Sequence, residues 1–157
     1  KATDAADGTK RPYARDYGFS RVALARASFP GNDRTGFDSA VKTASRINDN
    51  TLRAHTLWTL AAMRKRTGDD SGFETTRSVA TTATETIVSP LSQVWMYGDL
   101  ASAHLKAGEI DAAWVSFKEG LKVAEGVHNA WARARALGRL AAAISDLARA
   151  AAEAHRD

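Results

Sequence analysis

The sequence repeats itself at a spacing of 40 residues. Ile47, Ile87 and Val127 lie 40 residues apart, and each is followed by a polar break and a segment with helical apolar period. Further columns share this spacing: Leu57, Tyr97 and Leu137; Leu60-Ala61, Leu100-Ala101 and Leu140-Ala141; Gly68 and Gly108. Upstream, two dipeptides precede their counterparts by 36 residues: Leu24-Ala25 before Leu60-Ala61, and Gly36-Phe37 before Gly72-Phe73. A period of 20–50 residues is typical of arrays in which each unit buries its apolar face against its neighbours.

Each repeat predicts two helices joined by a short turn. Ser89 before Pro90 is a typical helix start, and Asp49 or Asn50, and Asn129, occupy the equivalent breaks. The turn glycines of the second and third units can end a first helix in the left-handed backbone conformation, and Glu109 and Asp111 favour the start of the next. Threonine is a poor helix former, so the fourth helix is the weakest. We predict seven helices, at residues 18–29, 35–46, 51–67, 72–86, 90–107, 110–125 and 130–154.

Composition places the chain among ordinary globular domains. Its 157 residues suffice for one domain or a short array, with 44% hydrophobic and 25% charged residues. No apolar run approaches the roughly 20 residues that a membrane span needs. The net charge of +4 weakly favours acidic partners. Without cysteine, the chain has no disulfides, thiolate chemistry or cysteine-based zinc sites.

The N-terminal segment differs from the repeats. Residues 1–16 are polar and interrupted by glycine and proline, so we expect a flexible leader or linker before a repeat domain at 17–157. The chain begins with Lys1 and not Met, which we interpret as the product of processing or trimming. This start and the absence of cysteine favour an exported or periplasmic bacterial domain, with a cytoplasmic location as the alternative.

The repeat resembles the tetratricopeptide repeat (TPR) superfamily. That family places a large residue, Leu with Gly or Ala, and an aromatic on its first helix, then a turn Gly, an Ala and an aromatic. The third unit carries Tyr97, Leu100, Ala101, His104, Gly108, Ala113 and Phe117; the second keeps Leu57, Leu60, Ala61 and Gly68; the first keeps Leu24, Ala25 and Phe37. The spacings of 36 and 40 depart from about 34 in the family, and the proline that ends its second helix is missing.

The resemblance implies an all-α fold. We expect a short right-handed α-solenoid of about three TPR-like helix hairpins plus a C-terminal capping helix. Arg133, Arg139 and Arg149 give this last helix the polar outer face that ends such an array.

The resemblance also implies a concave groove lined by the first helices. The residues that map to this face and are expected to contact a partner are Arg26, His55, Trp58, Lys65, Arg66, Trp95, Lys106 and Arg135. No acidic residue maps to it. Tryptophan supplies contact area, and arginine and lysine supply charge-assisted hydrogen bonds, so the surface suits a peptide with acids and one apolar anchor.

A packing role is the alternative for the tryptophans. Trp58 and Trp95 can hold adjacent first helices together by filling space beside Gly98 and Gly138. Trp114 and Trp131, at helix starts near turns, are interpreted as packing residues.

Catalysis is not expected. No Gly-x-Ser-x-Gly motif or metal-ligand spacing is present, and the histidines are scattered, with His104 where the family has a packing aromatic. The acids Asp69-Asp70, Glu109 and Asp111 suit helix starts. We therefore predict a scaffold or adaptor domain without cofactor or metal. The alternatives are a structural or self-assembling helical module and, less favoured, a single-stranded nucleic-acid binder.

Overall fold

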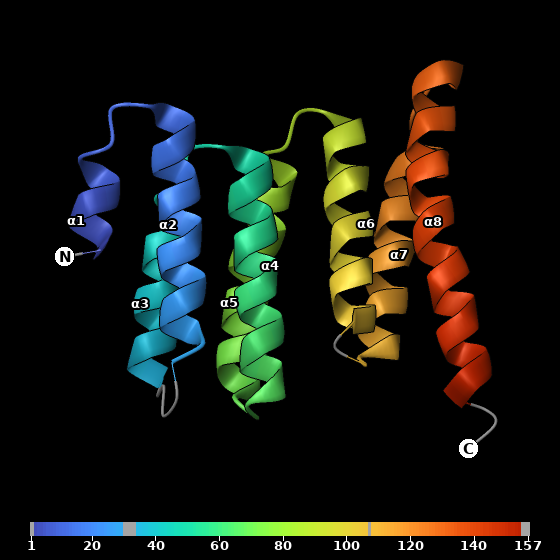
Figure 1. Ribbon diagram of the computed structural model, residues 1–157. Coiled ribbons are helices and arrows are strands. Elements are labelled where there is room, and N and C mark those ends of the chain that lie inside the picture. The colour runs from blue at the N-terminus through green and yellow to red at the C-terminus, as the bar shows by residue number, and fades with distance from the viewer. Residues whose placement is uncertain (1, 30–33, 107, 155–157) are drawn as a thin grey trace. The chain divides into compact units, whose positions relative to one another are not determined.

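The described residues of the chain are almost entirely helical. The computed structural model describes residues 2–29, 34–106 and 108–154, and these contain no strand. Their helices are α1 (Ala2–Asp7), α2 (Pro12–Ala27), α3 (Arg34–Ala44), α4 (Asn50–Arg66), α5 (Asp70–Glu85), α6 (Pro90–Lys106), α7 (Ile110–Glu125) and α8 (Ala130–Ala154) (Figure 1). The predicted all-α class is confirmed. In this part of the chain no helix is long and apolar enough to cross a membrane.

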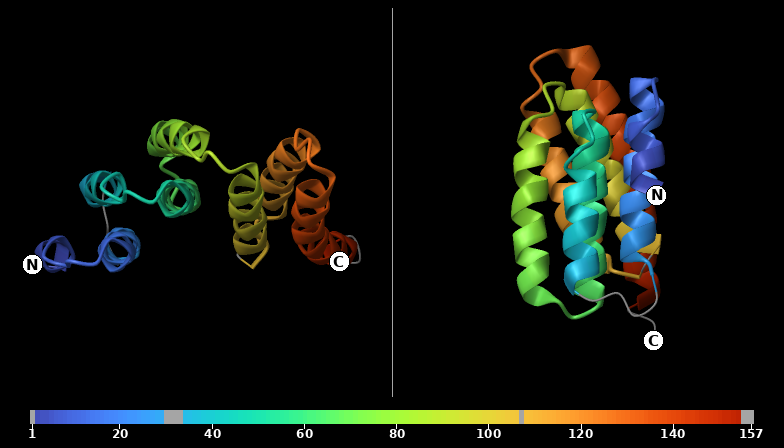
Figure 2. Two further views of the ribbon diagram at one scale, coloured as in Figure 1. Left: turned by 90° about the horizontal axis from the view of Figure 1, so that it is seen from above. Right: turned by 90° about the vertical axis from the view of Figure 1, so that its left-hand side faces the viewer.

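The chain divides into two compact units, Lys1–Thr86 and Ile87–Asp157. In the first unit, α2 packs against α3 and α4 against α5 as antiparallel hairpins, and α2 also contacts α4. Figure 2 shows α2 and α4 on one side of this unit and α3 and α5 on the other. In the second unit, α6 and α7 form a hairpin, and α8 packs on both.

Each predicted helical segment overlaps a helix of the structure, including the threonine-rich α5, but α2 begins at Pro12, where the prediction began at residue 18. Three of its threonine hydroxyl groups are satisfied within the helix: Thr75, Thr81 and Thr84 each donate a hydrogen bond of 2.9–3.0 Å to the carbonyl four residues earlier. Thr76 and Ala80 on the same helix are buried. Burial of this face against α4 therefore outweighs the low helix propensity of threonine.

The N-terminal segment is helical, and the prediction of a flexible leader at 1–16 is wrong for its described residues. Residues 2–7 form α1, and α2 begins at Pro12. Ala6 of α1 is buried against α2, where a Cβ added to Gly18 would lie 3.1 Å from the Ala6 Cβ. Asp7 accepts hydrogen bonds of 2.5 Å from Arg46. A helix this short has little stability alone, so these tertiary contacts are what hold it, and local composition does not reveal them.

The N-caps preserve the 40-residue spacing. The side chains of Asp49, Ser89 and Asn129 each accept a hydrogen bond from the backbone amide three residues later, at 2.7, 3.3 and 2.9 Å. The cap of α4 is thus Asp49 and not Asn50. These bonds satisfy amides that have no partner inside the helix, which is why each break precedes a helix.

A second interaction recurs at the same spacing. Arg53 donates to the carbonyl of Ile47, and Gln93 donates to the carbonyl of Ile87, both at 2.9 Å. Ile47 and Ile87 are buried. The Arg53 and Gln93 side chains therefore each connect the start of a first helix to the segment that precedes it.

The turn glycines between first and second helices adopt the predicted left-handed backbone conformation. Gly68 and Gly108 have φ values of 77° and 75°, where a side chain would be strained. Glu109 occupies the N-cap position of α7, as expected of an acid at a helix start, but its side chain makes no capping hydrogen bond. Its carboxylate instead lies 2.6 Å from Nδ1 of His104, which is largely buried, so this pair closes the turn.

Helix α2 is shifted in register relative to the predicted alignment. On α2, Ala23 and Ala27 are buried, whereas Leu24 is half-buried and Ala25 is exposed. The burial of α2 therefore matches that of α4 at 37 residues rather than 36, since Ala23 then corresponds to the buried Leu60. One residue of shift turns a helix face by about 100°, which redirects every α2 side chain.

The glycines inside helices differ in how tightly they are packed. No heavy atom lies within 4 Å of a Cβ added to Gly138 of α8. Gly138→Ala is therefore expected to raise the free energy of unfolding by about 1 kcal/mol, the helix-propensity difference, in urea denaturation followed by circular dichroism.

Gly120→Ala on α7 is the matched control. There a new Cβ would approach the Leu140 Cδ2 at 3.0 Å and the Tyr97 Cβ at 3.1 Å, so strain should offset the propensity gain. An equal gain at both positions would show that α7 is packed less closely than described.

Candidate functional site

An open cleft of about 500 Å³ lies between α6 and α8 in the second unit. Trp95 and Asp99 line it from α6, and Arg135 and Arg139 line it from α8. The two residues of each helix are four apart, so they share one face. The partners across the cleft, Trp95 with Arg135 and Asp99 with Arg139, are each 40 residues apart. The repeat therefore places equivalent positions of two successive first helices opposite each other.

Arg135 lies over two aromatic rings. Its guanidinium carbon is 4.9 Å from the ring centroid of Trp131 and 5.9 Å from that of Trp95. Such cation–π contacts are worth about 0.5–1 kcal/mol at exposed sites and orient the guanidinium. In the described part of the chain, no carboxylate lies within ion-pair distance of Arg135. Its N–H donors are consequently available to an acidic ligand.

Arg139 is engaged within the protein. Its guanidinium forms an ion pair with Asp99, and both side chains are about half exposed, at 49%. The prediction that this face carries no acid is therefore wrong, and so is the assignment of Arg139 to an outer polar face alone. An exposed pair of this kind contributes little stability, about 0–1 kcal/mol, but it neutralises one of the two cleft arginines. Arg135 is therefore the cleft arginine whose charge remains available to a ligand.

The two tryptophans that contact Arg135 are not packed between helices. Trp95 is 40% exposed and Trp131 is 66% exposed, which corrects the assignment of Trp131 as a packing residue. The atoms nearest to a Cβ on Gly98 belong to Arg139 and Leu140, and nothing lies within 4 Å of one on Gly138. Neither glycine therefore receives an indole ring, as the packing alternative required.

Trp114 does pack, as predicted. It is partly buried against the core of the second unit and makes an edge-to-face contact with Phe117 at 5.7 Å.

Arg26 connects three helices of the first unit through its guanidinium. Its guanidinium donates hydrogen bonds to Ser39 at 3.1 Å, Thr43 at 2.8 Å and Thr3 at 2.8 Å. It therefore ties α2 to α3 and α1. The register shift on α2 explains why a residue assigned to the groove turns toward the second helix of its own hairpin.

The other predicted residues of the first unit lie on α4. Trp58 is half-buried and donates from Nε1 to the Thr84 hydroxyl on α5 at 3.0 Å. Lys65 lies 2.5 Å from Asp70, His55 is half-buried, and Arg66 is exposed at the end of the helix. The side chain of Lys106 lies outside the described part of the structure. Trp95 and Arg135 are thus the predicted residues that share a cleft.

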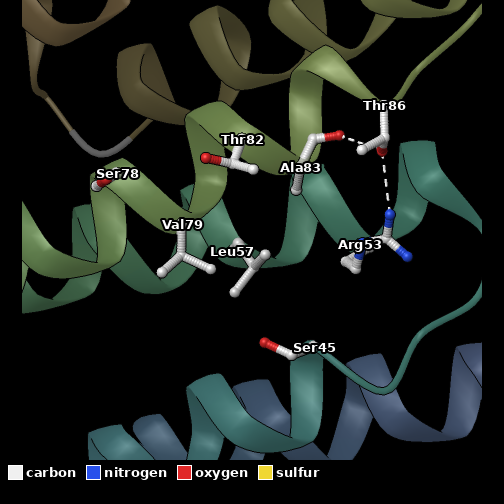
Figure 3. Close-up of a pocket in the computed structure, with 8 residues that line it drawn as sticks. All are labelled: Ser45, Arg53, Leu57, Ser78, Val79, Thr82, Ala83 and Thr86. Carbon is white, nitrogen blue, oxygen red and sulfur yellow. Dashed lines mark hydrogen bonds between the residues drawn. The ribbon is translucent and has the colours of Figure 1, made fainter.

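A second cavity, of about 320 Å³, lies in the first unit (Figure 3). Leu57, Val79 and Ala83 supply its apolar lining. Its one arginine, Arg53, is held by the Thr86 hydroxyl at 3.0 Å, and also by Asn50 and the Ile47 carbonyl. This cavity contains none of the predicted contact residues, and its cation is already bonded, so the α6–α8 cleft is the stronger candidate.

Metal-binding geometry is not found in the described ranges, where no three His, Cys, Asp or Glu side chains cluster. Comparisons with protein-family models, with curated proteins and with solved structures give no match to this chain.

Proposed function

We propose that this protein is a non-catalytic interaction domain of the TPR-like type, with its hairpins stacked as a short solenoid. In this proposal, the cleft between α6 and α8 binds an acidic segment of a partner protein that carries one apolar anchor. The observation that carries the proposal is Arg135, an exposed cation held on two exposed indoles without a carboxylate partner among the described residues.

The chemistry of the cleft supports this ligand class. A carboxylate can accept two N–H bonds from one guanidinium, which adds direction to charge attraction. Contact with the Trp131 and Trp95 rings limits the motion of the guanidinium, so binding costs less ordering entropy. An apolar side chain next to that carboxylate would cover indole surface that water now contacts.

The Asp99–Arg139 pair makes the two ends of the cleft electrostatically different. Asp99 lies one helical turn from Trp95, and its ion pair with Arg139 leaves no net positive charge to attract an acid at that end of the cleft. A bound segment is therefore oriented with its acid at Arg135 and its neutral part toward Asp99.

The test is direct binding of short fluorescent peptides rich in Asp and Glu, each with a single Leu, Ile or Phe. Anisotropy titrations should identify binders, and Trp95→Ala and Arg135→Glu should each weaken them by about 30-fold, the scale of an interface hot spot. The helical circular dichroism should not change, because both side chains are exposed.

Lys118→Glu on α7 is the matched control, since it makes the same charge change at another exposed site of this unit. It should leave affinity within about twofold. The proposal is wrong if no acidic peptide binds, or if peptides with Lys in place of the acids bind as tightly. Binding of a single-stranded oligonucleotide that falls steeply with salt would favour the nucleic-acid alternative instead.

A further inference from the structure

Helix α8 carries an apolar stripe that the described part of the chain does not cover. The stripe consists of residues spaced alternately four and three apart, all of them exposed: Ala130, Ala134, Leu137, Ala141, Ile144 and Ala148. This spacing places them on one helix face. Leu137 and Ile144 are 40% and 37% exposed, whereas Leu140 and Leu147, on the neighbouring face, are buried against the rest of the unit.

The residues equivalent to the middle of this stripe are buried on α6 and α4. Leu137 and Ala141 of α8 correspond, at 40 residues, to Tyr97 and Ala101 of α6, which are both buried. Tyr97 is covered by α7, since a Cβ added to Gly120 would lie 3.1 Å from its Cβ.

Helix α4 shows the same burial one 40-residue repeat earlier. Its equivalent residues, Leu57 and Ala61, are buried, and α4 packs against α5. The exposed stripe of α8 is therefore the surface on which α4 and α6 each receive the second helix of their hairpin.

The helices that cover this surface elsewhere show what fits it. Both are amphipathic, with small residues on the packed face: Thr76 and Ala80 on α5, Ala113 and Gly120 on α7. Both carry three acids, against one arginine in α5 and two lysines in α7. Small residues let the helix axes approach closely, and the acids outnumber the bases.

Charge on α8 distinguishes the possible occupants. The helix has four arginines and two acids, and Arg133, four residues before Leu137 and so beside the stripe, has no carboxylate partner in the described residues. A second copy of α8 would bring arginine-rich surfaces together, which is unfavourable. An acidic helix would instead be attracted.

We propose that the exposed stripe of α8 binds an acidic amphipathic helix of a partner protein, which packs as α7 packs on α6. The stripe and the Trp95–Arg135 cleft lie on different faces of α8, so this inference does not depend on the proposed cleft ligand.

The probe is a labelled synthetic peptide with the sequence of α7, residues 110–125, titrated into the whole chain. We expect saturable binding, which Leu137→Glu and Ile144→Glu each weaken by about tenfold or more, because each puts a charge of the wrong sign into the apolar contact. The milder Leu137→Ala should weaken binding by a smaller factor, and circular dichroism verifies that each variant is folded.

Val115→Glu is the matched control, because Val115 is an exposed apolar residue of α7 outside the stripe, and affinity there should change by less than about twofold. A peptide with lysine in place of its acids should bind about tenfold more weakly. The inference is overturned if the α7 peptide does not bind, or binds equally to the Leu137→Glu variant. It is also overturned if light scattering shows a dimer of the 16.8 kDa chain that Leu137→Glu dissociates, since a second copy would then cover the stripe.

Discussion

Leu140→Ala is expected to lower the free energy of unfolding of the second unit by about 3–4 kcal/mol. Leu140 is buried where the three helices of this unit meet: its Cδ2 lies 3.0 Å from a Cβ placed on Gly120 of α7 and 3.8 Å from one on Gly98 of α6. Truncation removes the apolar contacts of the side chain and leaves a cavity. Urea denaturation of the whole chain, followed by circular dichroism and tryptophan fluorescence, measures the loss.

Leu137→Ala is the control for this prediction. It deletes the same atoms from the same helix, three residues earlier, but Leu137 is 40% exposed. Its cost should stay below about 1 kcal/mol. Equal losses at the two positions would mean that α8 presents a different face to α6 and α7, and the inferred helix-binding stripe would be wrong as well.

Arg64→Ala is expected to lower the free energy of unfolding of the first unit by about 3 kcal/mol. Arg64 is only 2% exposed, and its guanidinium lies 2.5 Å from Asp38, 3.4 Å from Asp69 and over the ring of Phe37 at 5.3 Å. Removing one partner of a buried ion pair costs about 3–5 kcal/mol, and the lower end applies because both acids keep contact with water. Gly72 leaves room for this group, since a Cβ there would lie 2.2 Å from Nη1.

Two further variants separate charge from packing at Arg64. Arg64→Met keeps most of the apolar volume, so it should recover about half of the loss measured for alanine. Arg77→Ala removes the exposed Arg77–Glu74 pair on α5 and should cost no more than about 0.5 kcal/mol. Thermal or urea unfolding of the three variants under one set of conditions gives the comparison. A loss for Arg64→Ala that is no larger than for Arg77→Ala would contradict the structural role of the buried guanidinium.

The signals that predicted the helices are local ones. Asp49, Ser89 and Asn129 cap helices through bonds to amides three residues away, and Gly68 and Gly108 adopt a backbone conformation that other residues resist. Such effects act within one turn of chain, so the sequence displays them directly. The repeat spacing predicted in addition which helices are equivalent to one another.

The candidate site was only partly predictable. Trp95 and Arg135 were both named, because both map to one face of a first helix. The Asp99–Arg139 pair was missed, although the 40-residue repeat contains its signal: equivalent residues of α6 and α8 lie opposite each other. Arg26 was assigned to the wrong face because the burial pattern of α2 matches that of α4 at 37 residues and not at the predicted 36. No local feature of the sequence marks this shift of one residue.

The sequence by itself determined that this chain is helical, where most helices begin and end, and which leucines and alanines of the second and third repeats are buried. Those properties follow from capping, glycine conformation and apolar period, which depend on residues close in the chain. Only the tertiary structure decided that residues 2–7 form a packed helix, that Arg64 is buried, and that Trp131 and the α8 stripe are exposed. These outcomes depend on which helix lies across each face, because a side chain is buried only where a neighbour distant in the sequence covers it.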